Sequence, residues 1–155
     1  MHSQLTPFRI CRLAIFGLVI SLVLMVLAFT LPFYSYAYFL ESGTMTLFGV
    51  ADANKQILIP IIMIITAFVF DVCAIIFMLF LSKKKIVMAI GKGFSLASAF
   101  IFLGVFIISI CRLWVIPYEF DYLAYQTLDV GYIIYVLFLL YSGVLSCYIL
   151  GIHEK

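Results

Sequence analysis

The sequence predicts an all-α membrane protein: a bundle of four antiparallel transmembrane helices with a small extracellular cap formed by a β-hairpin or by three strands. Two observations predict this class. Of the 155 residues, 67% are hydrophobic and only 10% are charged, and a soluble domain of this size could not keep so much apolar surface out of water. The apolar residues also gather in four runs, each long enough to cross a hydrocarbon core of about 30 Å. We therefore expect a single domain, residues 1–155, with lipid as its main solvent.

The four predicted spans cover residues 13–33, 57–82, 93–115 and 131–152. The second is the most informative, because its apolar part is about 37 Å long as a helix and is followed by three lysines, Lys83, Lys84 and Lys85. For the first span, a cleavable signal peptide is the alternative interpretation, but the apolar run is longer than the core of a typical signal peptide.

The lysines and arginines predict the orientation. Seven of the nine lie beside the span ends that include both termini and the loop after the second span, whereas Lys55 and Arg112 lie on the other side. By the positive-inside rule, both termini and the middle loop face the cytoplasm. We therefore expect a multi-pass protein of the plasma membrane, with the lysine triplet as its main topology determinant.

The first outer loop carries a strand pattern. Tyr34, Tyr36 and Tyr38 alternate with smaller residues, and this period of two is typical of a strand. Residues 41–43 (Glu-Ser-Gly) offer turn chemistry and residues 44–50 are again β-favouring, so a hairpin over 34–50 is one prediction. An aromatic belt on an irregular loop is the alternative.

The second outer loop repeats the alternation over residues 118–122, which favours a third strand. Four aromatic residues of the two loops are candidates for an outer surface that binds a partner: Tyr36, Tyr38, Phe120 and Tyr122. Packing on the bundle and on lipid headgroups is the alternative explanation. The acids of the outer side have no calcium-ligand spacing, so we interpret them as a solvated face.

Asp71 is the only ionisable residue deep inside an apolar run. A carboxylate at this depth costs ~2.5–3.5 kcal/mol to insert and invites a functional hypothesis: a proton or cation site, or a contact for a basic residue of a partner. By depth, its candidate hydrogen-bonding neighbours in this intramembrane polar site are Ser21, Tyr141 and Ser142. The alternative is a neutral acid that is hydrogen-bonded inside the bundle.

Small residues recur at helical spacing on the first, third and fourth spans, where they allow close approach of another helix. Cys11 and Cys147 lie near the predicted inner leaflet and are candidates for lipidation, with an inert core cysteine as the alternative. No catalytic motif, metal-ligand spacing or basic stripe with spaced aromatics occurs. We therefore expect no enzyme activity, no cofactor, no metal and no nucleic-acid partner.

The plan of four spans, a hairpin over 34–50 and a further strand at 118–122 resembles, in topology, the claudin and peripheral myelin protein group. The resemblance implies cytoplasmic termini, a β-containing outer cap and a non-enzymatic function. We expect a structural or accessory protein that associates with other membrane proteins or with itself, in contact with membrane lipid. The alternative is a small transport or proton- or cation-coupled subunit that uses Asp71.

Overall fold

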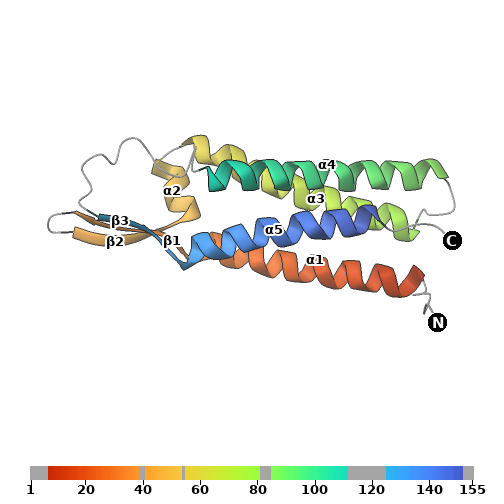
Figure 1. Ribbon diagram of the computed structural model, residues 1–155, viewed down its shortest axis with the longest axis horizontal. Coiled ribbons are helices and arrows are strands. Elements are labelled where there is room, and N and C mark those ends of the chain that lie inside the picture. The colour runs from red at the N-terminus through yellow and green to blue at the C-terminus, as the bar shows by residue number, and fades with distance from the viewer. Residues whose placement is uncertain (1–6, 39–40, 54, 81–84, 112–124, 152–155) are drawn as a thin grey trace.

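The computed structural model describes residues 7–38, 41–53, 55–80, 85–111 and 125–151. Four long helices lie side by side (Figure 1): α1 (Pro7–Thr30), α3 (Leu58–Phe80), α4 (Lys85–Ile110) and α5 (Val130–Leu150). Each is long and apolar enough to cross a membrane, which indicates a multi-pass membrane protein. α1 begins and α5 ends at one end of the bundle, and a small sheet lies at the other, which we call the sheet end.

The long helices pack in the order α3, α4, α5, α1. α3 packs along α4, α4 along α5, and α5 along α1, so α1 lies mainly beside the last helix rather than beside α3, the next long helix in the chain. On α1, the small residues Ala14, Gly17, Ser21 and Ala28 are all buried. α1 therefore meets α5 along its small-residue face, where Gly17 lies against Leu145 and Ser21 against Ser142, while large apolar side chains cover the outside.

One predicted boundary is wrong. Residues 86–92 were expected to connect the second and third spans, but α4 already begins at Lys85. Gly91 and Gly93 both belong to this helix, and Gly91 has a packing reason to be there. A Cβ at Gly91 would lie only 3.3 Å from the backbone oxygen of Ala74, so the glycine lets α4 approach α3 closely.

The sheet has three antiparallel strands in the order β2-β1-β3: β1 (Pro32–Tyr38), β2 (Glu41–Thr46) and β3 (Tyr125–Leu128). The predicted hairpin is confirmed by the pairing of β1 with β2. The third strand is residues 125–128, whereas the predicted segment 118–122 lies outside the described residues.

Two local predictions in this region are wrong. Residues 41–43 form part of β2, not the turn, because Gly43 pairs with Tyr36 and a Cβ there would lie 2.7 Å from the Tyr36 hydroxyl. The glycine thus makes room for a cross-strand ring. Residues 47–50 begin the short helix α2 (Leu47–Ala53) and are not strand. Leu47, Val50 and Ala51 are buried at the spacing of one helical face.

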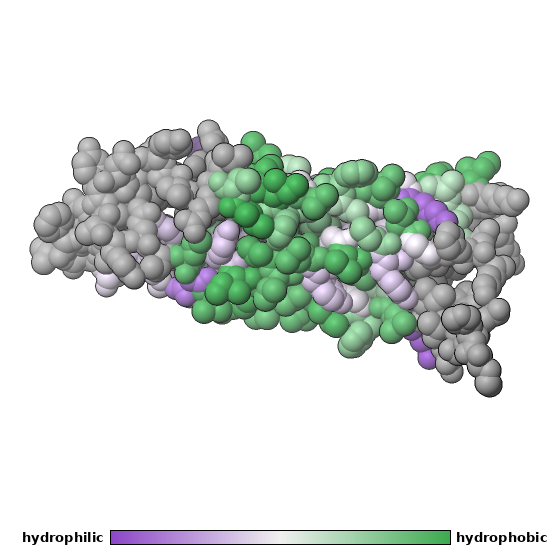
Figure 2. Space-filling model, in the orientation of Figure 1, coloured by the Kyte–Doolittle hydropathy of each residue, from purple (hydrophilic) through white to green (hydrophobic). Residues whose placement is uncertain are grey.

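The chain continues from α2 through a turn of 3-10 helix, η1 (Lys55–Ile57), into α3. On the face shown in Figure 2, hydrophobic residues cover the middle of the molecule and strongly hydrophilic residues lie near its two ends. This distribution is the one that a bilayer requires of a spanning bundle.

Inside, the core divides into two apolar clusters. The larger, at the sheet end, contains the fully buried rings of Phe33, Phe102, Tyr135 and Phe138. The smaller, toward the opposite end, is built from Ala14, Ala74, Ile75, Met78, Met88, Leu145 and Ile149. Ala67 belongs to the first and Ala74 to the second, so Asp71, midway between them on α3, lies at the junction of the clusters.

Candidate functional site

A set of buried hydroxyls and one carboxyl lies between the two apolar clusters. We call it the polar layer; each of its members is at most 1% exposed. The layer consists of Ser21 on α1, Asp71 on α3, Ser95 and Ser98 on α4, and Ser142 and Ser146 on α5. All four long helices therefore contribute to it, although they lie far apart in the sequence.

The carboxyl of Asp71 is held from one side. The Ser146 hydroxyl donates to Asp71 Oδ2 at 2.7 Å, and the Ser98 hydroxyl, which neighbours the same carboxyl, lies 3.1 Å from Ser146 Oγ. Among the described residues, the other oxygen, Oδ1, has no hydrogen-bond partner. By helical rise, Asp71 lies about 14 Å from the end of α3, so this oxygen is also far from the bundle end.

Two of the predicted neighbours of Asp71 belong to the layer. Ser21 and Ser142 are hydrogen-bonded to each other with 2.7 Å between their Oγ atoms. They reach Asp71 indirectly, through Ser146, whose hydroxyl lies 2.9 Å from the backbone oxygen of Ser142. The serines thus connect α1, α5 and α3 across the bundle.

Tyr141, the remaining predicted neighbour, takes a different position. It is half-buried, and its hydroxyl lies against α1, 3.4 Å from where a Cβ at Gly17 would be. No hydrogen bond joins it to the polar layer within the described part of the chain. Tyr141 therefore packs between α5 and α1 beside the layer.

Three serines of the layer were not predicted as site residues. Ser146 and Ser98 surround Asp71, and Ser95 donates to the backbone oxygen of Ser146 at 2.6 Å. Their spacing in the sequence could have shown that Ser142 and Ser146 share one face of α5 and that Ser95 and Ser98 share one face of α4. It could not show how each helix is rotated about its axis, and this rotation decides whether that face meets Asp71.

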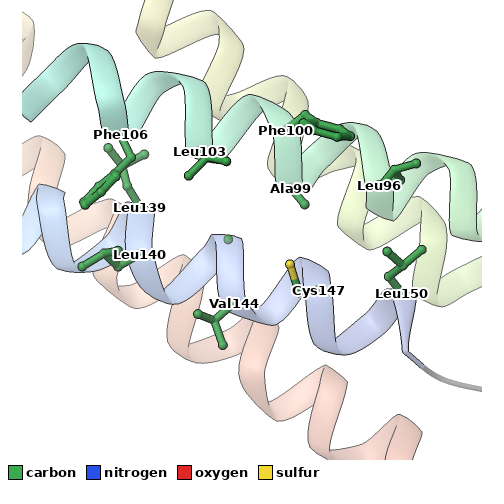
Figure 3. Close-up of a pocket in the computed structure, with 11 residues that line it drawn as sticks. Leu96, Ala99, Phe100, Leu103, Phe106, Leu139, Leu140, Val144, Cys147 and Leu150 are labelled. Atoms are coloured by element: carbon green, nitrogen blue, oxygen red, sulfur yellow. The ribbon is translucent and has the colours of Figure 1, made fainter.

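The outward face of α4 and α5 carries the second candidate feature, an apolar groove of about 390 Å³ (Figure 3). Ala99 from α4 and Cys147 from α5 point toward one another across it. The lining is formed by Leu96, Ala99, Phe100, Leu103, Phe106, Leu139, Leu140, Gly143, Val144, Cys147 and Leu150. Cys147, one of the two lipidation candidates, is exposed there as a free thiol. Cys11 lies in α1, and its side chain is outside the described residues.

The sheet end is tied to the bundle by its own polar contacts. Asp129 precedes α5 and accepts from the Val130 backbone N–H at 2.7 Å and from the Ser35 hydroxyl at 2.5 Å. These two donors, the serine first, lower the pKa of Asp129. The same joint requires Gly131, because a Cβ there would lie 2.5 Å from the backbone oxygen of Pro32. Burial raises the pKa of Tyr34 in β1.

The other predicted site residues are placed as follows. Tyr36 is half-buried and covers Gly43, and Tyr38 pairs with Glu41 at the end of β1. Lys85 begins α4 at the end of the bundle opposite the sheet. Phe120, Tyr122, Lys83 and Lys84 lie outside the described residues.

The described part of the chain contains no group of three or more His, Cys, Asp or Glu side chains that could hold a metal ion. Comparison with protein-family models, with curated proteins and with solved structures gives no match. The resemblance to the claudin and peripheral myelin protein group therefore stays a prediction, and the polar layer and the groove are the features that bear on function.

Proposed function

We propose that this chain is a non-enzymatic membrane protein that binds a transmembrane helix of another membrane protein in the groove between α4 and α5. Both termini face the cytoplasm, and the sheet faces outward. Support for the orientation comes from the basic residues of the opposite end, such as Arg12 and Lys92, and from the acids Asp52 and Asp129 at the sheet end.

The observation that carries the proposal is the shape of the groove. Leu103 and Phe100 of α4 and Leu140 and Val144 of α5 are exposed along its sides, while small side chains form the part between them. A third helix fits between two such ridges, because helices pack by placing the ridge of one into the groove of another. In lipid, where apolar surface gives no general attraction between helices, close fit of this kind provides the binding energy.

Gly143 supports the same conclusion. The nearest neighbour that a Cβ would meet there is the Cβ of Phe102, at an ordinary contact distance of 3.7 Å. Packing within the chain therefore does not require a glycine, and glycine costs about 1 kcal/mol relative to alanine inside a helix. Gly104 is also open, but Gly143 lines the groove, and close approach by a partner helix there gives it a reason to lack a side chain.

The proposal is tested by photo-crosslinking in native membranes. A photoreactive amino acid at Val144, in the groove, should give one discrete adduct with another protein. The same residue at Val26, which is exposed on α1, is the matched control and should give none. Gly143→Leu, which fills the groove, should abolish the adduct, while Gly104→Leu should preserve it, because Gly104 does not line the groove and nothing lies within 4 Å of a Cβ there.

Two outcomes would contradict the proposal. Adducts of lipid alone at both positions would mean that acyl chains fill the groove. An adduct with twice the mass of the chain would mean that the groove binds a second copy, and the function would then be self-association.

A further inference from the structure

The carboxyl of Asp71 has no counter-charge in the described structure. Among the buried residues described, it alone carries a carboxyl or a basic group. An ionised carboxylate in such surroundings is strongly disfavoured unless a positive charge neutralises it. The structure therefore poses the question of which positive species accompanies Asp71.

The hydroxyls around Asp71 supply too few protons for the oxygens present. Ser146 has one hydroxyl proton but lies within hydrogen-bonding distance of three oxygens: Asp71 Oδ2, the Ser142 backbone oxygen and Ser98 Oγ. Ser98 also has one, and it is directed to the backbone oxygen of Ala67 at 2.9 Å. No described residue donates to Asp71 Oδ1, so this part of the bundle holds more oxygen lone pairs than hydroxyl protons and no described basic group.

We propose that Asp71, Ser98 and Ser146 bind a small monovalent cation of the sodium type between α3, α4 and α5. One carboxylate matches one positive charge, and carboxylate and hydroxyl oxygens are the hard ligands that such ions prefer. Ser98 can keep its donation to the backbone oxygen of Ala67. Ser146 can turn its one proton from Asp71 Oδ2 to the backbone oxygen of Ser142, and both hydroxyls then direct lone pairs toward the ion. The ion would then satisfy Asp71 Oδ1 as well.

This site is separate from the groove on the outward face, so it goes beyond the association proposed above and does not depend on it. It also differs from a divalent-ion site, which is built from several carboxylates, because Asp71 has no second acid beside it among the described residues.

The test is equilibrium binding of radioactive ²²Na⁺ to the purified full-length chain in lipid nanodiscs. We expect saturable binding that is displaced by unlabelled Na⁺ and not by choline at equal ionic strength. Asp71→Asn should abolish the binding. Asp52→Asn, which removes the same charge from an exposed position on α2, should leave it unchanged.

Variants of the serines provide a second test, which does not depend on whether the Asp71 variant folds. Ser98→Ala should weaken Na⁺ binding by about tenfold, the usual scale for loss of a supporting group at a metal site. Ser109→Ala should leave it unchanged, because this buried serine donates to Val105 on its own helix at 2.6 Å. Absence of saturable Na⁺ binding by the unaltered chain would overturn the proposal and leave a proton as the neutralising species. Unchanged binding by Asp71→Asn or Ser98→Ala would also overturn it.

Discussion

Asp129 at the sheet end and Asp71 in the polar layer are two carboxyls with serine donors, and they differ in how completely they are hydrogen-bonded. Both oxygens of Asp129 accept a hydrogen bond, one from the Val130 N–H and one from Ser35. Only one oxygen of Asp71 does so within the described structure. Asp129 therefore has a complete structural role at the start of α5, whereas Asp71 keeps capacity for a ligand.

The side chains that surround the two carboxyls also differ. Near the sheet end, Phe33 packs edge-to-face on Tyr132 and Tyr135 at 5.5 Å, and Phe102 does so on Phe138 at 5.8 Å. Around Asp71, the hydrogen bonds are made by serines. Rings also pack toward the opposite end, where Phe94 lies 5.2 Å from Phe70 and 5.8 Å from Phe77, but the fully buried rings belong to the cluster at the sheet end. We therefore expect the sheet end to contribute more to stability than the polar layer does.

Among the variants considered, Phe102→Ala should cause the largest loss of stability. Its ring is fully buried against Phe138, and removing such a ring lowers the free energy of unfolding by about 3 kcal/mol or more. Reversible unfolding in detergent micelles measures it. Phe100→Ala is the control: the Phe100 ring is 66% exposed, and its loss should change stability by less than about 0.5 kcal/mol. Equal losses for both variants would mean that burial of the Phe102 ring at the sheet end does not stabilise the bundle.

Titration of Asp129 should change the stability of the fold less than Phe102→Ala does, because this carboxyl is open to water. Its pKa in the folded chain is lowered by the Ser35 and Val130 donors from an unfolded value of about 4. The stability it contributes is therefore present above the unfolded pKa and is lost as the pH falls through the folded pKa.

The measurement is the midpoint of thermal unfolding for the unaltered chain and for Asp129→Asn, from neutral pH into the acid range. The two midpoints should differ at neutral pH and converge in acid. Asp52→Asn controls for the loss of one negative charge. A difference that stays constant with pH would show that the carboxylate form of Asp129 does not stabilise the joint.

Sequence alone predicted the elements whose residue pattern reflects which side chains avoid water. The four long apolar helices follow from the length of the apolar runs, and the hairpin follows from the alternation of residues around Tyr36. Two local errors involve glycines. Gly43 was taken as part of a turn but lies in β2 beneath the Tyr36 ring, and Gly91 lies in α4 close to a backbone oxygen of α3. Such neighbours are fixed only by tertiary packing.

The candidate site was predictable in the same limited way. Asp71 could be singled out because an acid inside an apolar run is rare, and Ser21 and Ser142 could be placed near it by depth. Ser98 and Ser146, which lie closest to the carboxyl, could not, because depth does not give the rotation of α4 and α5. The groove on the outward face depends on that same rotation and was not predicted.

The most direct test of the overall account is the side of the membrane on which the sheet lies. In a chain whose native cysteines have been replaced, Ser42→Cys places a thiol at an exposed position of β2, and Ile86→Cys places one at the start of α4, where the side chain is 75% exposed. We predict that a membrane-impermeant maleimide labels Ser42→Cys on intact cells and labels Ile86→Cys only after permeabilisation. The reverse pattern, or labelling of both on intact cells, would contradict a bundle that crosses the membrane with its sheet outside.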